Sequence, residues 1–328
     1  MIQPKITLIG GGTGSFTLLQ ALKKVTPNIS ALVNMADDGG STGILRDELG
    51  VLPPGDVRQC LVALSDASPE VRDLFNFRFP NGTFAGHSFG NIFISAVEKM
   101  TSNFEDGVRM AGEILRITGR VLPISLESCV LQLALNDLII CGQRQIDLTQ
   151  FSPHARPTLS LKGKPVISAA SAAAIKEASL IAIAPGNLYA SLAPALIVDG
   201  VAGALAESSA PIVFVCNLVN KPNHTAGYGV HEYAEEIERF ITPAKLDYVL
   251  FNVDEPTPTL LNKYALKDEH PVHLDERPKS GSTYRLVNGN FLSHDDIKRD
   301  SSDMFIDRSL IRHNATAVVS AMGQLLHF

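Results

Sequence analysis

The sequence predicts an α/β protein with a doubly wound, mainly parallel, Rossmann-like sheet and an antiparallel β excursion. Apolar runs alternate with segments of helical periodicity along most of the 328 residues, which is the pattern of β-α-β units. The first two runs, Ile6–Ile9 and 29–35, are rich in β-branched residues, and each is followed by a cluster of small residues. Apolar runs of this length that end at glycine are typical of strands buried in a parallel sheet.

The first β-α-β unit consists of the strand Ile6–Ile9, a helix over residues 15–25 and the strand 29–35, with a right-handed crossover. Ser15 can cap this helix, because a serine hydroxyl accepts a hydrogen bond from a backbone N–H. Asp56 is expected to cap the next helix in the same way. The helices expected in this part of the chain cover 57–64, 69–77, 91–100 and 105–118.

The pattern changes between residues 121 and about 165. The apolar segments Val130–Leu135 and Leu138–Cys141 flank an Asn-Asp pair, and they predict a β-hairpin with a tight turn. Residues 145–148 and 158–161 are expected to add short strands. This region is interpreted as a β-rich excursion from the α/β core.

Alternation of helices and strands resumes beyond the excursion. Helices are expected over 169–178, 201–207, 231–240 and 315–326, and strands over 180–184, 212–216, 248–252 and, more weakly, 271–274 and 284–287. We interpret residues 1–328 as a single large α/β domain. Its β-rich insertion spans 121–165, and a C-terminal extension at 268–328 packs on it.

Composition excludes several classes of protein. Hydrophobic residues make up 45% of the chain and the net charge is −6, which fits a globular protein and argues against nucleic-acid binding. The longest apolar stretch, 188–198, contains Pro194 and is too short to span a bilayer. There is no room for a signal peptide before the first strand, and the four cysteines lack C-x-x-C spacing. We expect buried thiols and a cytoplasmic protein without a membrane span.

The first cluster of small residues predicts a phosphate-binding loop. It consists of Gly10, Gly11, Gly12, Thr13 and Gly14, between a strand and a helix. Glycines let the backbone approach a phosphate, and the N-terminus of the following helix supplies N–H groups and positive dipole. The dinucleotide fingerprint fits only with serine in place of its third glycine, and no P-loop lysine follows. The alternative is a tight turn without a ligand.

The second cluster, at the end of the second strand, adds carboxylates to the same edge. It begins with Asp37 and Asp38 and continues through Gly39 to Ser41. The carboxylates could hold a ribose hydroxyl, an attacking hydroxyl or a cation such as Mg²⁺. Alternatively, Asp38 caps a helix that runs through Arg46; both roles can hold at once.

Two further segments add candidate anion-binding positions. Arg58 follows Asp56 in a first helical turn, where its charge opposes the helix dipole, so a phosphate or acid contact is favoured over a surface ion pair. His87 and Ser88 lie in a G-x-S-x-G sequence that matches a hydrolase nucleophile elbow. A turn-rich loop precedes it instead of the required strand. We interpret it as a loop leading into a helix at Asn91.

Polar residues also follow the later strands. Gly186 and Asn187 come after the strand at 180–184, and Asn217 comes after the next strand. Ligands of open α/β sheets bind at the carboxyl ends of the strands. The row of polar groups therefore predicts a nucleotide site along this edge.

Together these segments resemble the family that includes the bacterial gluconeogenesis factors (YvcK-type) and the archaeal phospholactate transferases (CofD-type). The segments that carry the resemblance are 10–14, 36–41, 45–46, 53–58, 86–91, 185–189 and 216–217, and they fall within about residues 5–265. The Asp-Asp-Gly-Gly-Ser sequence and the extended Pro-Pro-Gly-Asp segment are more similar to the gluconeogenesis factors.

The gluconeogenesis-factor side of this resemblance implies a cytoplasmic protein for carbon-source use, cell-wall supply and rod shape that binds a UDP-sugar. The transferase side implies transfer of a phospholactyl-type group from a guanosine diphosphate donor to a deazaflavin hydroxyl, with Mg²⁺. On that side Asp38 is the candidate near the acceptor hydroxyl and the metal. Positions in the C-terminal pattern make Tyr264 and Arg312 candidate sugar or diphosphate contacts.

Asn187, Ala226 and Asn314 depart from the family pattern, near the expected sugar or second-substrate end. Three hypotheses follow. The first is a regulatory protein that binds a nucleotide sugar and forms a homo-oligomer. The second is a Mg²⁺-dependent transferase of deazaflavin cofactor synthesis. The third, a structural module without a small ligand, is disfavoured because so many helix starts meet at one edge.

Overall fold

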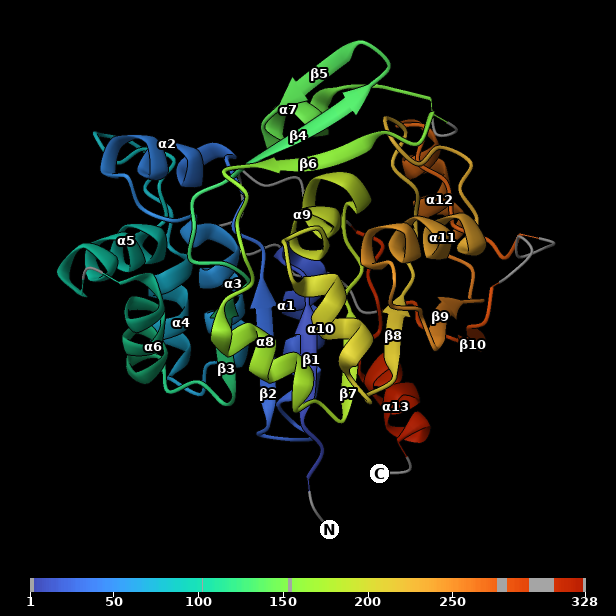
Figure 1. Ribbon diagram of the computed structural model, residues 1–328, viewed down its shortest axis with the longest axis horizontal. Helices are drawn as coiled ribbons and strands as arrows, with labels where there is room; N and C mark the ends of the chain where they lie inside the picture. The colour runs from blue at the N-terminus through green and yellow to red at the C-terminus, as the bar shows by residue number, and fades with distance from the viewer. Residues whose placement is uncertain (1–2, 102, 153–154, 276–281, 295–309, 327–328) are drawn as a thin grey trace.

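The computed structural model describes residues 3–101, 103–152, 155–275, 282–294 and 310–326. Helices cover both faces of a central sheet, and a smaller sheet lies beyond the carboxyl ends of its strands (Figure 1). This arrangement confirms the predicted α/β class.

Seven strands of the described residues form the main sheet, in the order β10-β9-β8-β7-β1-β2-β3, and all neighbouring pairs are parallel. They are β1 (Ile6–Ile9), β2 (Ile29–Val33), β3 (Arg120–Pro123), β7 (Leu180–Ile183), β8 (Ile212–Val215), β9 (Tyr248–Asn252) and β10 (Arg285–Gly289). The chain winds from β1 to β3 in one direction and from β7 to β10 in the other. The sheet is therefore doubly wound, as predicted, and its switch point lies between β1 and β7.

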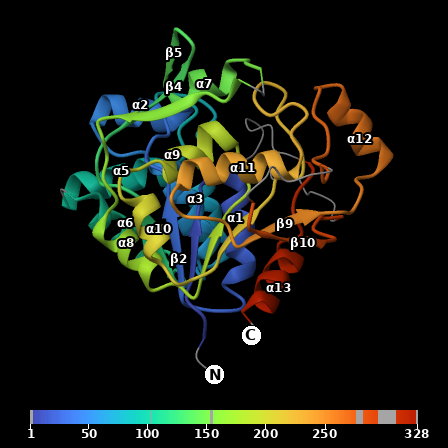
Figure 2. The same cartoon turned by 45° about the vertical axis from the view of Figure 1, so that its right-hand side comes forward.

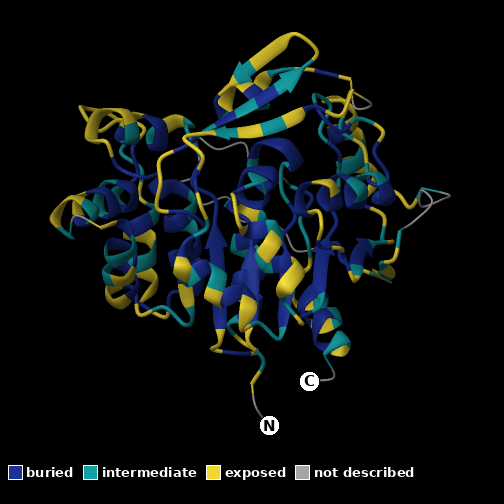
Figure 3. Ribbon diagram, in the orientation of Figure 1, coloured by how far each residue is buried: buried dark blue, intermediate teal, exposed yellow. Residues whose placement is uncertain are grey.

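Helices on both faces explain why the central strands are mainly apolar and buried throughout. Every residue of β1, β2, β7 and β8 is buried, and Figure 3 shows these strands dark blue between helices with exposed outer sides. Burying each large apolar side chain contributes about 1.5–3 kcal/mol. The helices nearest these strands are α1 (Gly12–Leu22), α3 (Pro54–Leu64) and α13 (Ala315–Leu325) on one face, and α8 (Ala169–Lys176), α10 (Val201–Glu207) and α11 (Val230–Ile241) on the other.

The remaining helices lie beside this core. Four lie on the β3 side of the sheet, where α6 contacts β3 and the other three pack around α5 and α3, and α12 lies beyond the other end of the sheet (Figure 1). They are α2 (Gly40–Leu49), α4 (Pro69–Asn76), α5 (Phe89–Thr101), α6 (Phe104–Ile114) and α12 (Pro258–Ala265). The short α9 (Ala193–Leu196) follows a π-helical turn, η2 (Leu188–Leu192), after β7.

The second sheet is antiparallel, with the order β5-β4-β6. Its strands are β4 (Val130–Leu135), β5 (Leu138–Cys141) and β6 (Thr158–Lys162), which confirms the predicted hairpin and the strand at 158–161. Leu131 and Leu133 of β4 are buried and belong to the main hydrophobic core. Figure 2 shows this sheet standing beyond the carboxyl edge of the main sheet. Because β3 belongs to the main sheet, the excursion has its first strand at Val130.

One predicted strand is a helix. Residues 145–148 lie in α7 (Gln143–Leu148), which begins after Gly142, whose φ of 95° suits glycine. Within residues 145–148 only Ile146 is buried, while the side chain of Leu148 is exposed. One buried residue is compatible with a short helix as well as with a short strand. The sequence of this segment therefore could not distinguish the two.

Three predicted helix caps are also wrong. Ser15 lies buried inside α1, which begins at Gly12, and Asp56 lies in the first turn of α3, after the N-cap Pro53. The N-cap of α2 is Gly39 rather than Asp38. Glycines and prolines allow these helices to begin earlier than their periodic apolar residues suggest.

Two other expectations need correction. The strand expected over 271–274 is irregular backbone that makes an isolated bridge between Val219 and Pro271. Cys141 is exposed on β5, whereas the other three cysteines are buried as expected. Within the described ranges, no helix has both the length and the apolar character needed to cross a membrane.

The burial of Leu133 predicts that the second sheet is part of the cooperative core. Replacing Leu133, which is fully buried, with alanine should lower the free energy of unfolding by about 2–5 kcal/mol. Leu138→Ala, at a side chain 54% exposed, should change it by less than about 0.5 kcal/mol. Equal, small effects in chemical denaturation would instead mean that this sheet unfolds separately.

Candidate functional site

The loops that follow β1 and β7 touch each other at the switch point of the sheet. A methyl group on Gly14 would lie 2.0 Å from the carbonyl oxygen of Pro185, so this contact requires glycine. A methyl group on Gly11 would lie 2.1 Å from Oδ2 of Asp56. The start of α1 is therefore enclosed between the loop after β7 and the first turn of α3.

Asp56 faces the start of α1. Its Oδ1 accepts a hydrogen bond from the backbone N–H of Gly12 at 3.0 Å. Burial, and secondarily the negative charge of Asp37, raises the pKa of Asp56 to about 7, against the opposing effects of that hydrogen bond and of Arg58. The carboxyl group is thus close to half protonated at neutral pH, and the first N–H of α1 already has an acidic partner.

Asp37 and Asp38 have different surroundings. The Oδ1 of Asp37 accepts the Gly39 N–H at 3.0 Å, and burial raises the pKa of Asp37. The Oδ1 of Asp38 accepts the Arg144 N–H of α7 at 2.8 Å. Asp38 therefore joins the loop after β2 to α7 rather than capping α2.

Asp37 and Asp56 suit a magnesium ion better than other groups of the site. The Oδ1 of each carboxylate accepts a backbone hydrogen bond, and Asp37 also accepts a hydrogen bond from the Thr42 side chain, so a cation would share these carboxylates with their present partners. Mg²⁺ commonly takes one or two carboxylates and fills its octahedron with phosphate oxygens and water. Across the described ranges, no group of three or more His, Cys, Asp or Glu residues could hold a metal. Any metal here would depend on ligand phosphates.

Arg58 is buried and held by neutral side chains. Its Nε donates to Oδ1 of Asn91 at 2.9 Å, and its Nη1 donates to Oδ1 of Asn76 at 2.5 Å. The alternative of a surface ion pair is therefore wrong. The Nδ2 of Asn91 in turn donates to Oγ of Ser41 at 3.3 Å, and this hydroxyl lies 3.0 Å from Nδ1 of His87. Residues predicted from three separate segments thus form one network across α2, α3 and α5.

Ser88 has a structural role at the start of α5. It is fully buried, and its Oγ accepts the Asn91 N–H at 3.3 Å. The segment before it is a loop that makes only an isolated bridge, between Arg78 and Ser88. A nucleophile elbow requires a strand there, so the hydrolase interpretation is excluded.

The loops after β7 and β8 are joined by an amide pair. Asn217 Nδ2 donates to the Gly186 carbonyl at 2.8 Å, and its Oδ1 accepts the Gly186 N–H at 3.3 Å. Asn187 caps the π-helical turn through its Oδ1, which accepts the Ala190 N–H at 3.3 Å. The predicted residues 186, 187 and 217 therefore lie together beside the loop after β1.

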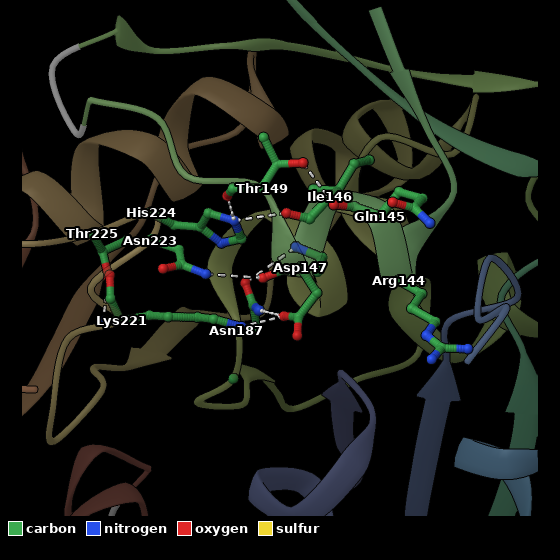
Figure 4. A network of polar contacts seen from close by, with 12 residues as sticks. Arg144, Gln145, Ile146, Asp147, Thr149, Asn187, Lys221, Asn223, His224 and Thr225 are labelled. Carbon is green, nitrogen blue, oxygen red and sulfur yellow. Dashed lines mark hydrogen bonds and ion pairs between the residues drawn. The ribbon is translucent and has the colours of Figure 1, made fainter. Parts of the chain in front are cut away.

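Two polar residues of this edge were missed by sequence reasoning. Asp147 projects from α7, and its Oδ1 accepts hydrogen bonds from Nδ2 of Asn187 at 2.5 Å and from Nζ of Lys221 (Figure 4). Lys221 lies four residues beyond Asn217 in the loop after β8. Its position just after a predicted strand was an available signal. Asp147 was assigned to a strand and had no such signal.

Tyr264 and Arg312 lie at the other end of the site. The hydroxyl of Tyr264 accepts the N–H groups of Leu310 and Ile311 at 2.7 and 3.0 Å. Nε2 of His313 is 3.0 Å from the Cys216 carbonyl, which brings this segment to the carboxyl end of β8. A cavity of about 180 Å³ opens nearby, lined by Leu218, 251–256, 271–274, Leu292 and Ile311.

This geometry defines an open, doubly wound α/β protein with a candidate ligand site at the switch point of its sheet. Residues 6–292 match the family model "2-phospho-L-lactate transferase CofD". The chain belongs to the CofD family, as the sequence resemblance indicated.

Within this family the chain is similar to gluconeogenesis factors. It is 34% identical to the gluconeogenesis factor of Halalkalibacterium halodurans, with 98% of this chain and 96% of the relative covered. A Nostoc protein that is provisionally named a gluconeogenesis factor is 41% identical over 89% of this chain, which spans 64% of that relative's length. A crystal structure of a UPF0052 family member from Bacillus halodurans has a TM-score of 0.86 and 32% identity, over 99% of this chain and all of the other.

The raised pKa of Asp56 predicts a pH-dependent cost to stability. Between about pH 4 and 7 the folded chain keeps a proton on Asp56 that the unfolded chain releases, so this group makes stability fall as pH rises through that window. Asp56→Asn should therefore raise the free energy of unfolding at pH 8 by about 1–2 kcal/mol, and by much less at pH 5.

Asp66→Asn is a control of opposite sign. The Thr118 hydroxyl, and then Lys23, lowers the pKa of Asp66, so this substitution should destabilise the protein at pH 8. Chemical denaturation at both pH values measures both effects. A loss of stability of the same size at pH 5 and pH 8 for Asp56→Asn would show that Asp56 is ionised throughout.

Proposed function

We propose that the chain binds a nucleoside diphosphate sugar at the switch point and acts as a cytoplasmic regulator of carbon metabolism, cell-wall supply and cell shape. The observation that carries the proposal is the contact between the loops after β1 and β7. It brings the start of α1 beside Gly186 and Asn187, within the reach of one diphosphate. Parallel α/β sheets bind phosphates at such a point.

The proposed ligand lies along the carboxyl edge of the sheet. Its phosphates contact the backbone of 10–14 and the loop at Gly186, and its ribose hydroxyls reach Asp37 or Asp38. Its sugar extends toward Tyr264 and Arg312, where the cavity beside β9 has room for a small polar group. Tyr264 is buried and its hydroxyl accepts the N–H groups of Leu310 and Ile311, so it would act on the sugar by holding Ile311 in the cavity wall.

The names of similar proteins support the regulatory part of the proposal. Relatives from Halalkalibacterium halodurans and Bacillus subtilis, matched over almost their whole length, are named gluconeogenesis factors. A cytoplasmic location and a homo-oligomeric state belong to the same proposal.

A second candidate is a Mg²⁺-dependent transferase of the phospholactate type. It is supported by the family match and by the neighbouring carboxylates of Asp37 and Asp56. Bound Mg²⁺ would neutralise charge on a diphosphate. Asp37 and Asp56 would hold the ion, and Asp38 would orient an acceptor hydroxyl.

Thermal unfolding with added nucleotides distinguishes these functions. A ligand at one hundred times its Kd stabilises the folded state by about 2.7 kcal/mol, which corresponds to roughly several degrees in Tm for a chain of this length. UDP-N-acetylglucosamine or UDP-glucose should raise Tm selectively. A rise only with GDP and Mg²⁺, deepened by a deazaflavin, would favour the transferase. No shift with any of these compounds would contradict nucleotide binding.

Asp38→Asn tests the transferase directly. The amide keeps the size of the side chain but removes its charge, so transfer to a deazaflavin acceptor should be abolished if Asp38 acts on the acceptor hydroxyl. Asp47→Asn, at an exposed side chain on α2, is the matched control and should leave transfer intact. Undiminished transfer in Asp38→Asn would remove this residue from the chemistry.

A further inference from the structure

The structure holds an ammonium group beside the predicted phosphate loops that the site described so far does not use. We infer that Lys221 is a phosphate-binding residue that selects a diphosphate over an uncharged nucleoside, and that Asp147 holds it in place until the ligand arrives. The inference rests on the proposed nucleotide site and adds a residue to it.

Position is the first argument. Lys221 and Asn187 share one oxygen of Asp147, and Asn187 directly follows Gly186 in the loop that touches Gly14 through Pro185. In Figure 4, Asp147 points from α7 toward the ends of the Lys221 and Asn187 side chains. The ammonium group is therefore connected by one shared partner to the loop where the phosphates are placed.

Charge is the second argument. Asp37, Asp38 and Asp56 bring negative charge to the edge where a diphosphate would bind, so a compensating positive charge is needed. Arg46 and Arg58 offset part of the charge of Asp37 and Asp56, but the Arg58 guanidinium donates to amide oxygens on the side of α5. Lys221 is a compact point charge with three donors, a form of phosphate contact common in proteins. Among the described residues, the hydrogen bond to Asp147 is the one side-chain contact of its ammonium group.

The weakness of the Lys221–Asp147 pair is the third argument. The two side chains are 33% and 42% exposed, and ion pairs at such positions contribute little to stability. Other contacts also anchor α7. His224 Nε2 lies 2.8 Å from the Ile146 carbonyl and 3.1 Å from the Thr149 carbonyl. A phosphate can therefore replace Asp147 as the hydrogen-bond partner of the Lys221 ammonium group with little loss of stability, while α7 stays in place.

Substitutions at the two partners should have opposite effects on affinity. Lys221→Met should weaken binding of UDP-N-acetylglucosamine at least about tenfold, because a charge-assisted hydrogen bond is lost. Lys221→Arg should restore most of it. Asp147→Asn removes the competing charge but keeps an oxygen for Asn187 and Lys221, so its affinity should equal or exceed that of the wild type. Lys245→Met, at an exposed lysine paired with Glu238, is the control and should change nothing.

Calorimetric titration of the full chain at two salt concentrations measures these effects, and Tm of each free variant checks folding. Equal weakening in Lys221→Met and Asp147→Asn would show that the pair merely fastens α7, and would overturn the inference. Wild-type affinity in Lys221→Met would overturn it as well, with nucleotide binding intact. If neither UDP-N-acetylglucosamine nor GDP binds the wild type, the proposed function itself fails, and the inference fails with it.

Discussion

The close approach of two loops at the centre of the sheet determines the rest of this structure. Gly14 sits against the carbonyl of Pro185, with no space for even a methyl group. This contact fixes the start of α1 relative to the turn after β7, and Asn217 then fixes that turn relative to β8. Each later element of the site is positioned from this junction, so small side chains here matter more than any individual polar group.

The same junction concentrates acidic groups in a place that does not favour their charge. Burial raises the pKa of both Asp37 and Asp56; the charge of Asp38 further disfavours ionisation of Asp37, and the charge of Asp37 further disfavours ionisation of Asp56. Neutral side chains at these two positions would give the protein a higher free energy of unfolding near neutral pH. Two costly carboxylates next to a helix N-terminus are most simply explained by a ligand that uses them, either through hydroxyl groups or through a cation.

Most of the fold could be predicted because short apolar runs that end at glycines seldom form anything other than buried strands. The strands β1, β2, β7, β8 and β9 were predicted to within two residues at either end. The helix α7 was not, because Ile146 is its one anchoring residue and a single buried side chain has no period. The direction of the Asp56 side chain could not be predicted either. The local sequence is compatible both with an N-cap at Asp56 and with its contact to Gly12. The position of Lys221 after a strand was a signal in the sequence, but its partner Asp147 lies 74 residues earlier and could not be predicted.

The upper wall of the site comes from a separate stretch of chain, the helix α7 next to the small antiparallel sheet. It meets the loops after β2, β7 and β8 through two contacts, Asp147 with Asn187 and Lys221, and Asp38 with the backbone of Arg144. No strand of the main sheet passes through it. Residues of α7 can therefore be substituted one at a time without a change in the main sheet below. Related chains can keep the loops at the switch point unchanged while the residues above them diverge.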